Sequence, residues 1–333
     1  MTKPVAMAEV WRGDFLECVH RGHAVVCDTA GKIVQAWGNP DEIILPRSSC
    51  KMIQALPLVE SGAADAFGLT TEQLALACAS HQAAAVHTDR VGRWLDSLGL
   101  DDNALRCGPQ MPRDEDEMTR LIRRAGTPCR YHNNCSGKHS GFLTLTRHLN
   151  GGPDYVEPEH PVQRAVREAF EDVTGMDSPG FGIDGCSAPN FATTVHGLAR
   201  AMGFFAAARE GDSTLRSRAA ARLVQAMTTF PELVAGEGRA CTDLMRAMGG
   251  KVAVKTGAEG AFVAILPEQK LGVAVKIQDG ATRAANLAIT ALLVHLGALD
   301  ATHPAVSRWM QVRQQNYAGI DTGWLQPAAG FPA

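Results

Sequence analysis

Short apolar runs separated by glycine or turn residues dominate the first forty residues. These runs are rich in residues that favour β-structure, and they cover residues 6–11, 15–21, 23–28 and 33–37. Short runs of this kind, bounded by glycine-containing breaks, are typical of strands joined by tight turns. The N-terminal part is therefore predicted to be an antiparallel meander.

The middle of the chain, from about 58 to 245, has apolar residues at helical spacing. The expected helices cover residues 87–98, 114–125, 160–174, 190–208 and 215–230. A shorter helix is expected before them, beginning at Pro46 and carrying Ser48 and Lys51, because proline is favoured in the first turn of a helix.

The last third returns to strand patterns. The expected strands are 251–256, 261–266 and 271–277, followed by a helix from about 282 to 296. The Gly- and Pro-containing tail after Tyr317 is expected to be partly loose. We expect the early and late strand blocks to join in one antiparallel sheet.

The predicted fold class is α/β (α+β), with an antiparallel sheet flanked by helices and a mainly helical lobe. The chain is interpreted as a single catalytic unit, 1–333, with two lobes. Residues 1–57 and 246–333 form the predicted sheet-containing lobe, and 58–245 form the predicted helical lobe.

Composition narrows the possible functions. Hydrophobic residues make up 45% and charged residues 20% of the 333 positions, and the net charge is −3. These values are ordinary for a globular protein and give no indication of a nucleic-acid partner. No apolar run approaches the roughly 18 residues of a membrane span, and the N-terminus lacks the apolar region of a secretory signal. We expect a cytoplasmic protein without membrane contact, in which most of the nine cysteines are reduced.

The most informative local pattern is Ser48-x-x-Lys51. On a helix, residues at i and i+3 share a face, so the amine and the hydroxyl can meet. A neutral lysine can then activate the serine as a nucleophile. An unperturbed lysine has a pKa of about 10.4, so burial, a neighbouring cation or both must lower this pKa to favour the neutral amine. A second lysine is therefore expected elsewhere in the chain. Taken alone, the pattern more often reflects a capping serine at a helix start and a solvated lysine.

Two later segments provide a second hydroxyl and a second amine. Lys255-Thr256-Gly257 ends an expected strand, and Ser80 follows an expected helix. A Ser-x-x-Lys pair, a second serine and a Lys-Thr-Gly strand, in this order, also occur in serine enzymes that recognise penicillin. Each element alone is compatible with an ordinary strand end or helix end, and the spacing does not decide which serine is attacked.

A possible metal site lies in the polar run around Cys135, with Cys186 further along the chain. Thiolates are ligands that suit zinc, and His139 is the obvious third ligand by chemistry, since Lys138 binds a metal only as the neutral amine. The alternative interpretation is that these are two buried cysteines beside a polar loop. The absence of a Cys-x-x-Cys pair favours this alternative.

Together these segments resemble the rhizobial-type L-asparaginase family over nearly the whole chain. The motifs that carry the resemblance are Pro46-Arg47-Ser48-Ser49-Cys50-Lys51, Ala79-Ser80-His81, Asn134-Cys135-Ser136-Gly137-Lys138-His139, Gly182-Ile183-Asp184-Gly185-Cys186 and Lys255-Thr256-Gly257. That family is similar in fold to serine β-lactamases and glutaminases.

The resemblance implies two Ser-Lys tandems, Ser48 with Lys51 and Ser80 with Lys255. It also implies one zinc ion held by Cys135, Lys138 and Cys186, which replaces the chemical expectation of His139 as a ligand. His139 and Asp184 then become groups for the substrate or the metal's water, and Arg47 becomes a candidate for the substrate carboxylate.

The expected activity is hydrolysis of L-asparagine to L-aspartate and ammonia through an acyl-enzyme, with zinc positioning the substrate, in a homodimer. Three alternatives stay open at this point. They are a glutaminase or β-lactam-recognising enzyme on the same fold, a hydrolase that uses zinc-bound water, and a non-enzymatic amino-acid sensor.

Overall fold

The computed structural model describes residues 3–332, and the chain divides into two compact units. Unit 1 comprises Met1–Ser49, Thr193–Ala207 and Asp243–Ala333, and unit 2 comprises Cys50–Ala192 and Ala208–Thr242. Both predicted strand blocks lie in unit 1. Residues 193–207, which the predicted ranges placed with the helical middle, also belong to unit 1, and the first boundary falls after Ser49 rather than after residue 57.

Unit 1 contains an eight-stranded sheet in the order β11-β12-β1-β2-β10-β9-β8, with β3 paired to β2, within the described residues. Every pairing in it is antiparallel. The strands are β1 (Val5–Arg12), β2 (Phe15–Asp28), β3 (Ile33–Trp37), β8 (Ala253–Thr256), β9 (Ala261–Leu266), β10 (Leu271–Ile277), β11 (Val312–Gln315) and β12 (Asp321–Pro327). The early and late strand blocks join through β2 and β10, as predicted.

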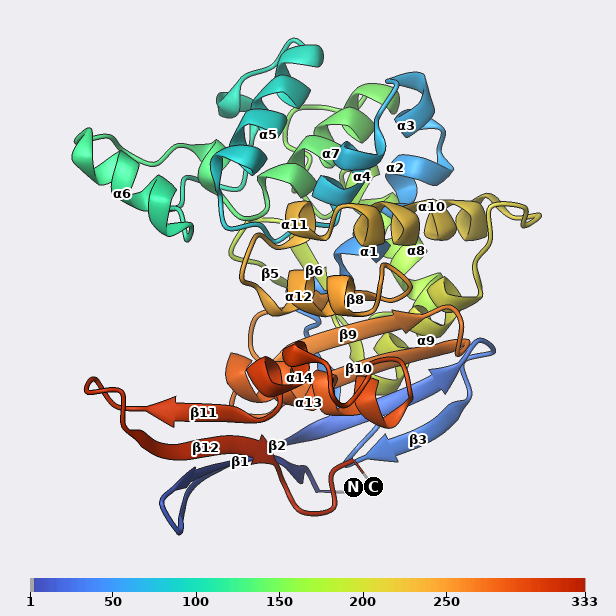
Figure 1. Cartoon of the computed structure of the whole chain (residues 1–333). Coiled ribbons are helices and arrows are strands. Elements are labelled where there is room, and N and C mark those ends of the chain that lie inside the picture. Colours follow the sequence, from blue (N-terminus) through green and yellow to red (C-terminus); the bar gives the residue numbers. More distant parts are fainter. Residues whose placement is uncertain (1–2, 333) are drawn as a thin grey trace. The chain divides into compact units, whose positions relative to one another are not determined.

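The two ends of the described chain lie in neighbouring strands. β12, red in Figure 1, pairs with β1, dark blue, through a register that includes Val10 opposite Leu325. The expectation of a partly loose tail after Tyr317 is therefore wrong, because residues 321–327 form a strand between β1 and β11. The runs 15–21 and 23–28 likewise form one strand, β2, that passes through Gly22.

Helices cover both faces of the centre of this sheet. Residues Gly272–Val275 of β10 are all buried, and α9 (Val195–Ala207) and α13 (Thr282–His295) both pack against this strand. Because successive side chains of a strand point to opposite faces, burial of consecutive residues requires cover on both sides. This explains why β10 has a continuous apolar run instead of an alternating pattern.

The approach of α9 to the sheet depends on two glycines. A Cβ atom on Gly272 would lie 2.0 Å from the backbone nitrogen of Gly203, and one on Gly203 would lie 2.4 Å from the carbonyl oxygen of Asp28. Both distances are far below contact, so any larger residue would force the helix off the strands. This close approach attaches α9 to unit 1.

The remaining elements of unit 1 are short. They are β4 (Ile43–Ile44), which pairs with β7 (Thr193–Thr194), and α14 (Pro304–Trp309). The 3-10 helix η1 (Arg47–Cys50) begins at the end of the first segment of unit 1, and α12 (Ala240–Ala247) spans the last boundary between the units.

Unit 2 is mainly helical. Its helices are α1 (Lys51–Gln54), α2 (Leu56–Glu60), α3 (Ala63–Ala66), α4 (Thr71–Ala77), α5 (Ala85–Ser97), α6 (Glu115–Arg123), α7 (Ser136–His148), α8 (Pro161–Thr174), α10 (Leu215–Thr229) and α11 (Pro231–Val234), with 3-10 helices η2 (Asp102–Ala104) and η3 (Arg130–His132). A hairpin of β5 (Phe181–Ile183) and β6 (Pro189–Phe191) completes the unit. The predicted α/β (α+β) class is thus confirmed.

The single helix expected from Pro46 is divided. η1 covers Arg47–Cys50, α1 starts at Lys51, and α2 follows after Ala55, with Pro57 in its first turn. Arg47 has a φ of 54°, a left-handed conformation that does not fit an α-helix. None of the helices in residues 3–332 combines the length and the apolar character needed to cross a bilayer.

Candidate active site

Lys51 and Ser80 meet inside unit 2. Lys51 is the first residue of α1 and its side chain is fully buried. Its Nζ atom donates to the carbonyl oxygen of Ala79, and it lies 3.0 Å from Oγ of Ser80 and 3.1 Å from Sγ of Cys135. A buried amine is thereby held against a partly exposed serine hydroxyl, the arrangement that nucleophilic activation requires.

The loop that carries Ser80 is held on two sides. The Ser80 amide donates to the carbonyl of Val234 at 2.8 Å, and the His81 amide donates to the carbonyl of Asn134 at 3.2 Å. The His81 ring adds a 2.9 Å contact between Nε2 and Oγ of Ser136. Because these bonds fix the backbone on both sides of the Ser80 side chain, the hydroxyl is presented in one place.

A glycine sets the distance between this loop and the helix that follows Cys135. A Cβ atom on Gly137 of α7 would lie 2.4 Å from the carbonyl oxygen of Leu76 in α4. Since α4 leads into Ser80 and α7 carries Lys138, only glycine permits the two helices to approach this closely.

Next to the lysine lies a cluster formed by Cys135, Lys138, Asp184 and Cys186. The ligand atoms of Cys135, Asp184 and Cys186 lie within 4.8 Å of one another, and Nζ of Lys138 lies 3.1 Å from Sγ of Cys186. Cys135 precedes α7, whereas Cys186 lies in the turn of the β5–β6 hairpin. The contact between Lys51 and Cys135 joins this cluster to the Lys51–Ser80 pair.

The two thiols differ in proton affinity. A hydrogen bond from Cys135 lowers the pKa of Cys186 to about 5 despite its burial. The same bond, with burial, raises the pKa of Cys135. Burial alone would lower the pKa of Lys138, but the charges of Cys186, Cys135 and Asp184 raise it overall. Without a metal, the arrangement is an ammonium group beside a thiolate.

These residues fit a zinc ion. Ligands at about 2.3 Å from a tetrahedral zinc lie about 3.8 Å apart, within the spread of the cluster. Two thiols and an amine form the soft donor set that zinc accepts, and burial of Cys135, Lys138 and Cys186 isolates the site from bulk water. Cys135, Lys138 and Cys186 are thus brought together in the set that the resemblance implied, with Asp184 alongside.

His139 has a different environment. Its Nδ1 atom lies 2.8 Å from the Tyr155 hydroxyl, which accepts the Arg106 amide at 2.8 Å. The simplest assignment gives the Tyr155 proton to Nδ1 and leaves the imidazole proton on Nε2. That Nε2 is buried and has no partner among the described residues. As an N–H donor it suits an oxygen of a substrate or water better than a metal ion.

Burial and the charge of Lys138 lower the pKa of His139 well below its ordinary value, so this ring is neutral. The sequence indicated His139, but no signal in it identified Tyr155, which lies 16 positions away and orients the ring.

Ser48, Arg47 and Lys255 lie in unit 1. A Cβ atom on Gly257, directly after β8, would lie 2.7 Å from the carbonyl of Pro46 and 3.0 Å from the amide of Ser49. The Lys-Thr-Gly strand end therefore abuts the segment that carries Ser48. The buried Lys255 donates to the carbonyl of Thr256 at 2.8 Å.

Arg47 lies at the same end of β8. Its Nη1 is 4.0 Å from Oε1 of Glu259, and both residues have positive φ, 54° and 57°. Left-handed backbone at non-glycine residues costs free energy and is often retained near functional sites. Within unit 2 the motifs bring Lys51 to Ser80, and within unit 1 they bring the segment that carries Ser48 to the Lys-Thr-Gly strand end.

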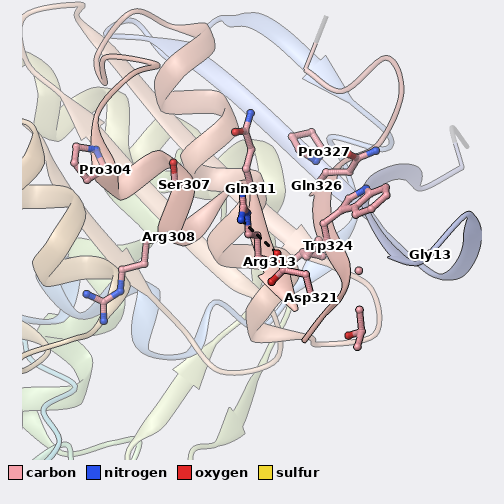
Figure 2. A pocket seen from close by; sticks show the side chains of 13 residues that line it. Gly13, Pro304, Ser307, Arg308, Gln311, Arg313, Asp321, Trp324, Gln326 and Pro327 are labelled. Carbon is pink, nitrogen blue, oxygen red and sulfur yellow. Dashed lines mark hydrogen bonds and ion pairs between the residues drawn. The ribbon is translucent and has the colours of Figure 1, made fainter. Parts of the chain in front are cut away.

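A separate groove of about 1060 Å³ lies in unit 1, along β12 and α14 (Figure 2). Arg313 and Asp321 form an ion pair of 3.3 Å in it, and Trp324 is partly exposed at its wall. None of the predicted catalytic, substrate-binding or metal-binding residues lines this groove in the described part of the chain.

Fold and site together define an α+β protein with a buried lysine–serine pair beside a cysteine cluster. The family model for L-asparaginase II matches residues 8–327. The chain therefore belongs to the L-asparaginase II family and is an enzyme of the asparaginase-type amidohydrolase class.

Solved structures similar to the chain include a β-lactamase from Mycobacterium bovis, with 15% identity over 86% of this chain and 94% of that chain and a TM-score of 0.45. Another is Mglu in its tris and glutamate form, with 15% identity over 95% of this chain and 68% of that chain and a TM-score of 0.48. No curated protein in the comparison matches the chain.

Proposed function

We propose that the protein is an L-asparaginase, which hydrolyses the side-chain amide of L-asparagine to L-aspartate and ammonia. The observation that carries the proposal is the 3.0 Å contact between the buried amine of Lys51 and the hydroxyl of Ser80, in a chain of the L-asparaginase II family. A hydroxyl held by a buried amine supports covalent catalysis of amide hydrolysis.

In the proposed mechanism, Lys51 in its neutral form takes the proton from a serine Oγ. The Oγ attacks the carboxamide carbon, and the C–N bond breaks as ammonia leaves with a proton. Water then hydrolyses the serine ester and regenerates the hydroxyl. The contact of Lys51 favours Ser80 as its hydroxyl, whereas the family resemblance pairs Lys51 with Ser48 and Ser80 with Lys255.

The proposed metal site consists of Cys135, Lys138 and Cys186. When bound, zinc would supply a positive charge that orients an oxygen of the substrate. His139 supports the same role through its unpartnered Nε2, and Asp184 lies within 4.8 Å of both thiols. Arg47 is proposed to bind the substrate carboxylate through its guanidinium group.

The acyl-enzyme is the decisive test of this mechanism. Rapid quench of the enzyme with L-asparagine, followed by peptide mass analysis, should locate an aspartyl ester on one serine. Single Ser48→Ala and Ser80→Ala variants should each lose turnover by about 100-fold or more. Ammonia release at the normal rate from both variants would exclude a serine nucleophile and favour hydrolysis by zinc-bound water.

A glutaminase is the second candidate, because one methylene often changes binding by only about 1–3 kcal/mol. Ammonia release from asparagine and glutamine, measured side by side, separates the two. A higher kcat/KM for glutamine would replace the proposed substrate and leave the Ser-Lys mechanism intact.

A homodimer and a cytoplasmic location also stay proposals. Light scattering tests the oligomeric state, and cell fractionation tests the location.

A further inference from the structure

A second group of reactive side chains lies in unit 2 among residues that the proposed hydrolysis does not use. Sγ of Cys129 is 3.2 Å from Nδ1 of His132. On the other side of the ring, Nε2 of His132 is 3.6 Å from Oε1 of Glu117. A thiol, an imidazole and a carboxylate thus follow one another in the order that activates a cysteine nucleophile.

This group opens onto a pocket. The pocket has a volume of about 350 Å³, and its lining includes Cys129, Tyr131 and His132 together with residues of α5. Cys129 is one of two cysteines that are not fully buried among residues 3–332; the other is Cys18. A volume of this size admits a small molecule to the sulfur atom.

The hydrogen bonds define where the proton is. The Cys129 amide donates to Nδ1 of His132 at 2.9 Å, so Nδ1 holds a lone pair and the ring proton is on Nε2, facing Glu117. Nδ1 is therefore a base within reach of the thiol proton. Glu117 is buried and held by Arg120 at 2.7 Å, which fixes the carboxylate beside the ring.

The electrostatics agree with this geometry. Burial opposes ionisation of Cys129, but the hydrogen bond between its thiol and His132 lowers the pKa of the thiol overall. The bond to Cys129 raises the pKa of His132, with a further contribution from the charge of Glu117. The other charged or titratable groups at the pocket are Asp89, Arg93 and Asp96 of α5 and Tyr131 of η3.

We propose that Cys129, His132 and Glu117 form a reactive-thiol site that takes small-molecule disulfides and is separate from the proposed asparagine site. His132 Nδ1 accepts the thiol proton as Sγ of Cys129 attacks one sulfur of the disulfide. The S–S bond of the small molecule breaks, a mixed disulfide forms on Cys129, and the released thiolate takes up the proton. Glu117 stabilises the imidazolium in between.

The experiment uses the full chain and 4,4′-dithiodipyridine as the probe disulfide, with modified cysteines located by peptide mass. Cys18 serves as the internal reference, because it is also partly exposed but lies 3.7 Å from its histidine, His20. Cys129 should react at least roughly tenfold faster than Cys18 in the same molecule, since a positioned base accelerates the attack. Equal rates for the two thiols would overturn the proposal.

Three variants complete the test. Cys129→Ser should abolish the fast adduct. His132→Asn should slow Cys129 by roughly tenfold or more without changing Cys18, and an unchanged rate in a folded His132→Asn protein would contradict the assigned base. Circular dichroism checks that this variant folds. If it does not, two other measurements decide. They are the reaction rate of Cys129 in Glu117→Gln, which should decrease by a smaller factor, and the ratio of the Cys129 and Cys18 rates in the wild type.

Discussion

The amine of Lys51 lies 3.0 Å from the hydroxyl of Ser80, although 29 positions separate the two residues. The same amine contacts Cys135 at 3.1 Å, so the lysine connects the serine to the cysteine cluster. Lys51, Ser80 and the proposed metal ligand Cys135 of unit 2 therefore form one group of touching side chains.

Replacement of Lys51 by methionine should remove turnover while keeping the buried chain volume. We expect Lys51→Met to lower kcat for asparagine by about 100-fold or more, because the amine of Lys51, 3.0 Å from the Ser80 hydroxyl, is the proposed acceptor of the serine proton. Ammonia release measures the effect. Lys251→Met is the control, since Lys251 is exposed and pairs only with Glu268 among the ion pairs of the described chain; equal activity of the two variants would contradict the role of Lys51.

Metal content separates the ligands from their neighbours. Wild-type protein should carry about one zinc per chain by elemental mass analysis, since structural and catalytic zinc sites need three or four such donors. Cys135→Ser and Cys186→Ser should each lose most of it. His139→Ala should retain it while raising KM, because a protonated Nε2 on His139 is a hydrogen-bond donor and not a metal ligand. Loss of zinc from His139→Ala alone would reverse the assignment.

Acid should destabilise the protein through two stacked histidines in unit 2. The rings of His81 and His87 lie 4.9 Å apart. Burial lowers the pKa of both below 6.5, with a further decrease at His81 from the charge of His87. The unfolded chain therefore binds these protons first as the pH falls. The contribution of the two neutral histidines to the free energy of unfolding is complete above about pH 6.5 and is lost below it.

The free energy of unfolding should fall below pH 6.5 by up to roughly 1.4 kcal/mol per pH unit for each linked proton. Urea unfolding across this range measures the slope. His87→Gln should reduce the slope while keeping a donor for the carbonyl of Glu232. His148→Gln, a change at a partly exposed histidine, is the matched control; identical slopes for wild type and His87→Gln would refute the linkage.

Gly137→Ala should disturb the geometry of the site without changing any of its reactive groups. The added Cβ would meet the Leu76 carbonyl at 2.4 Å, and overpacking of this kind costs about 1–3 kcal/mol. The free energy of unfolding and turnover should both fall, because α7 must move away from α4. Gly152→Ala is the control, since nothing lies within 4 Å of its Cβ position; a fully active and stable Gly137→Ala protein would show that the contact is unimportant.

Much of the fold followed from the order of residues. The late strands were predicted at 261–266 and 271–277, and they are β9 and β10 at those bounds. Strands of this kind are encoded locally, by β-favouring residues between turns, and so they need no knowledge of distant partners. The Ser, Lys and Cys motifs were likewise visible as types and spacings.

The sequence did not reveal which distant segments pair with one another. The tail after Tyr317 showed no strong strand pattern, yet residues 321–327 form β12 because β1 and β11 supply hydrogen-bonding partners on both sides. α9 was predicted as a helix of the middle segment, but Gly203 and Gly272 allow it to pack on the sheet of unit 1. The Pro46 segment does not begin as an α-helix because Arg47 adopts a left-handed backbone.

The sequence by itself therefore determined the secondary structure of the strongly patterned segments, the family and the identities of the candidate catalytic and metal-binding residues. Only the tertiary structure decided that Lys51 touches Ser80 and Cys135, that Tyr155 orients His139, and that Cys129 lies between a base and a pocket. The reason is physical: propensity and periodicity act over a few neighbouring residues, whereas contacts between side chains depend on packing across the whole unit.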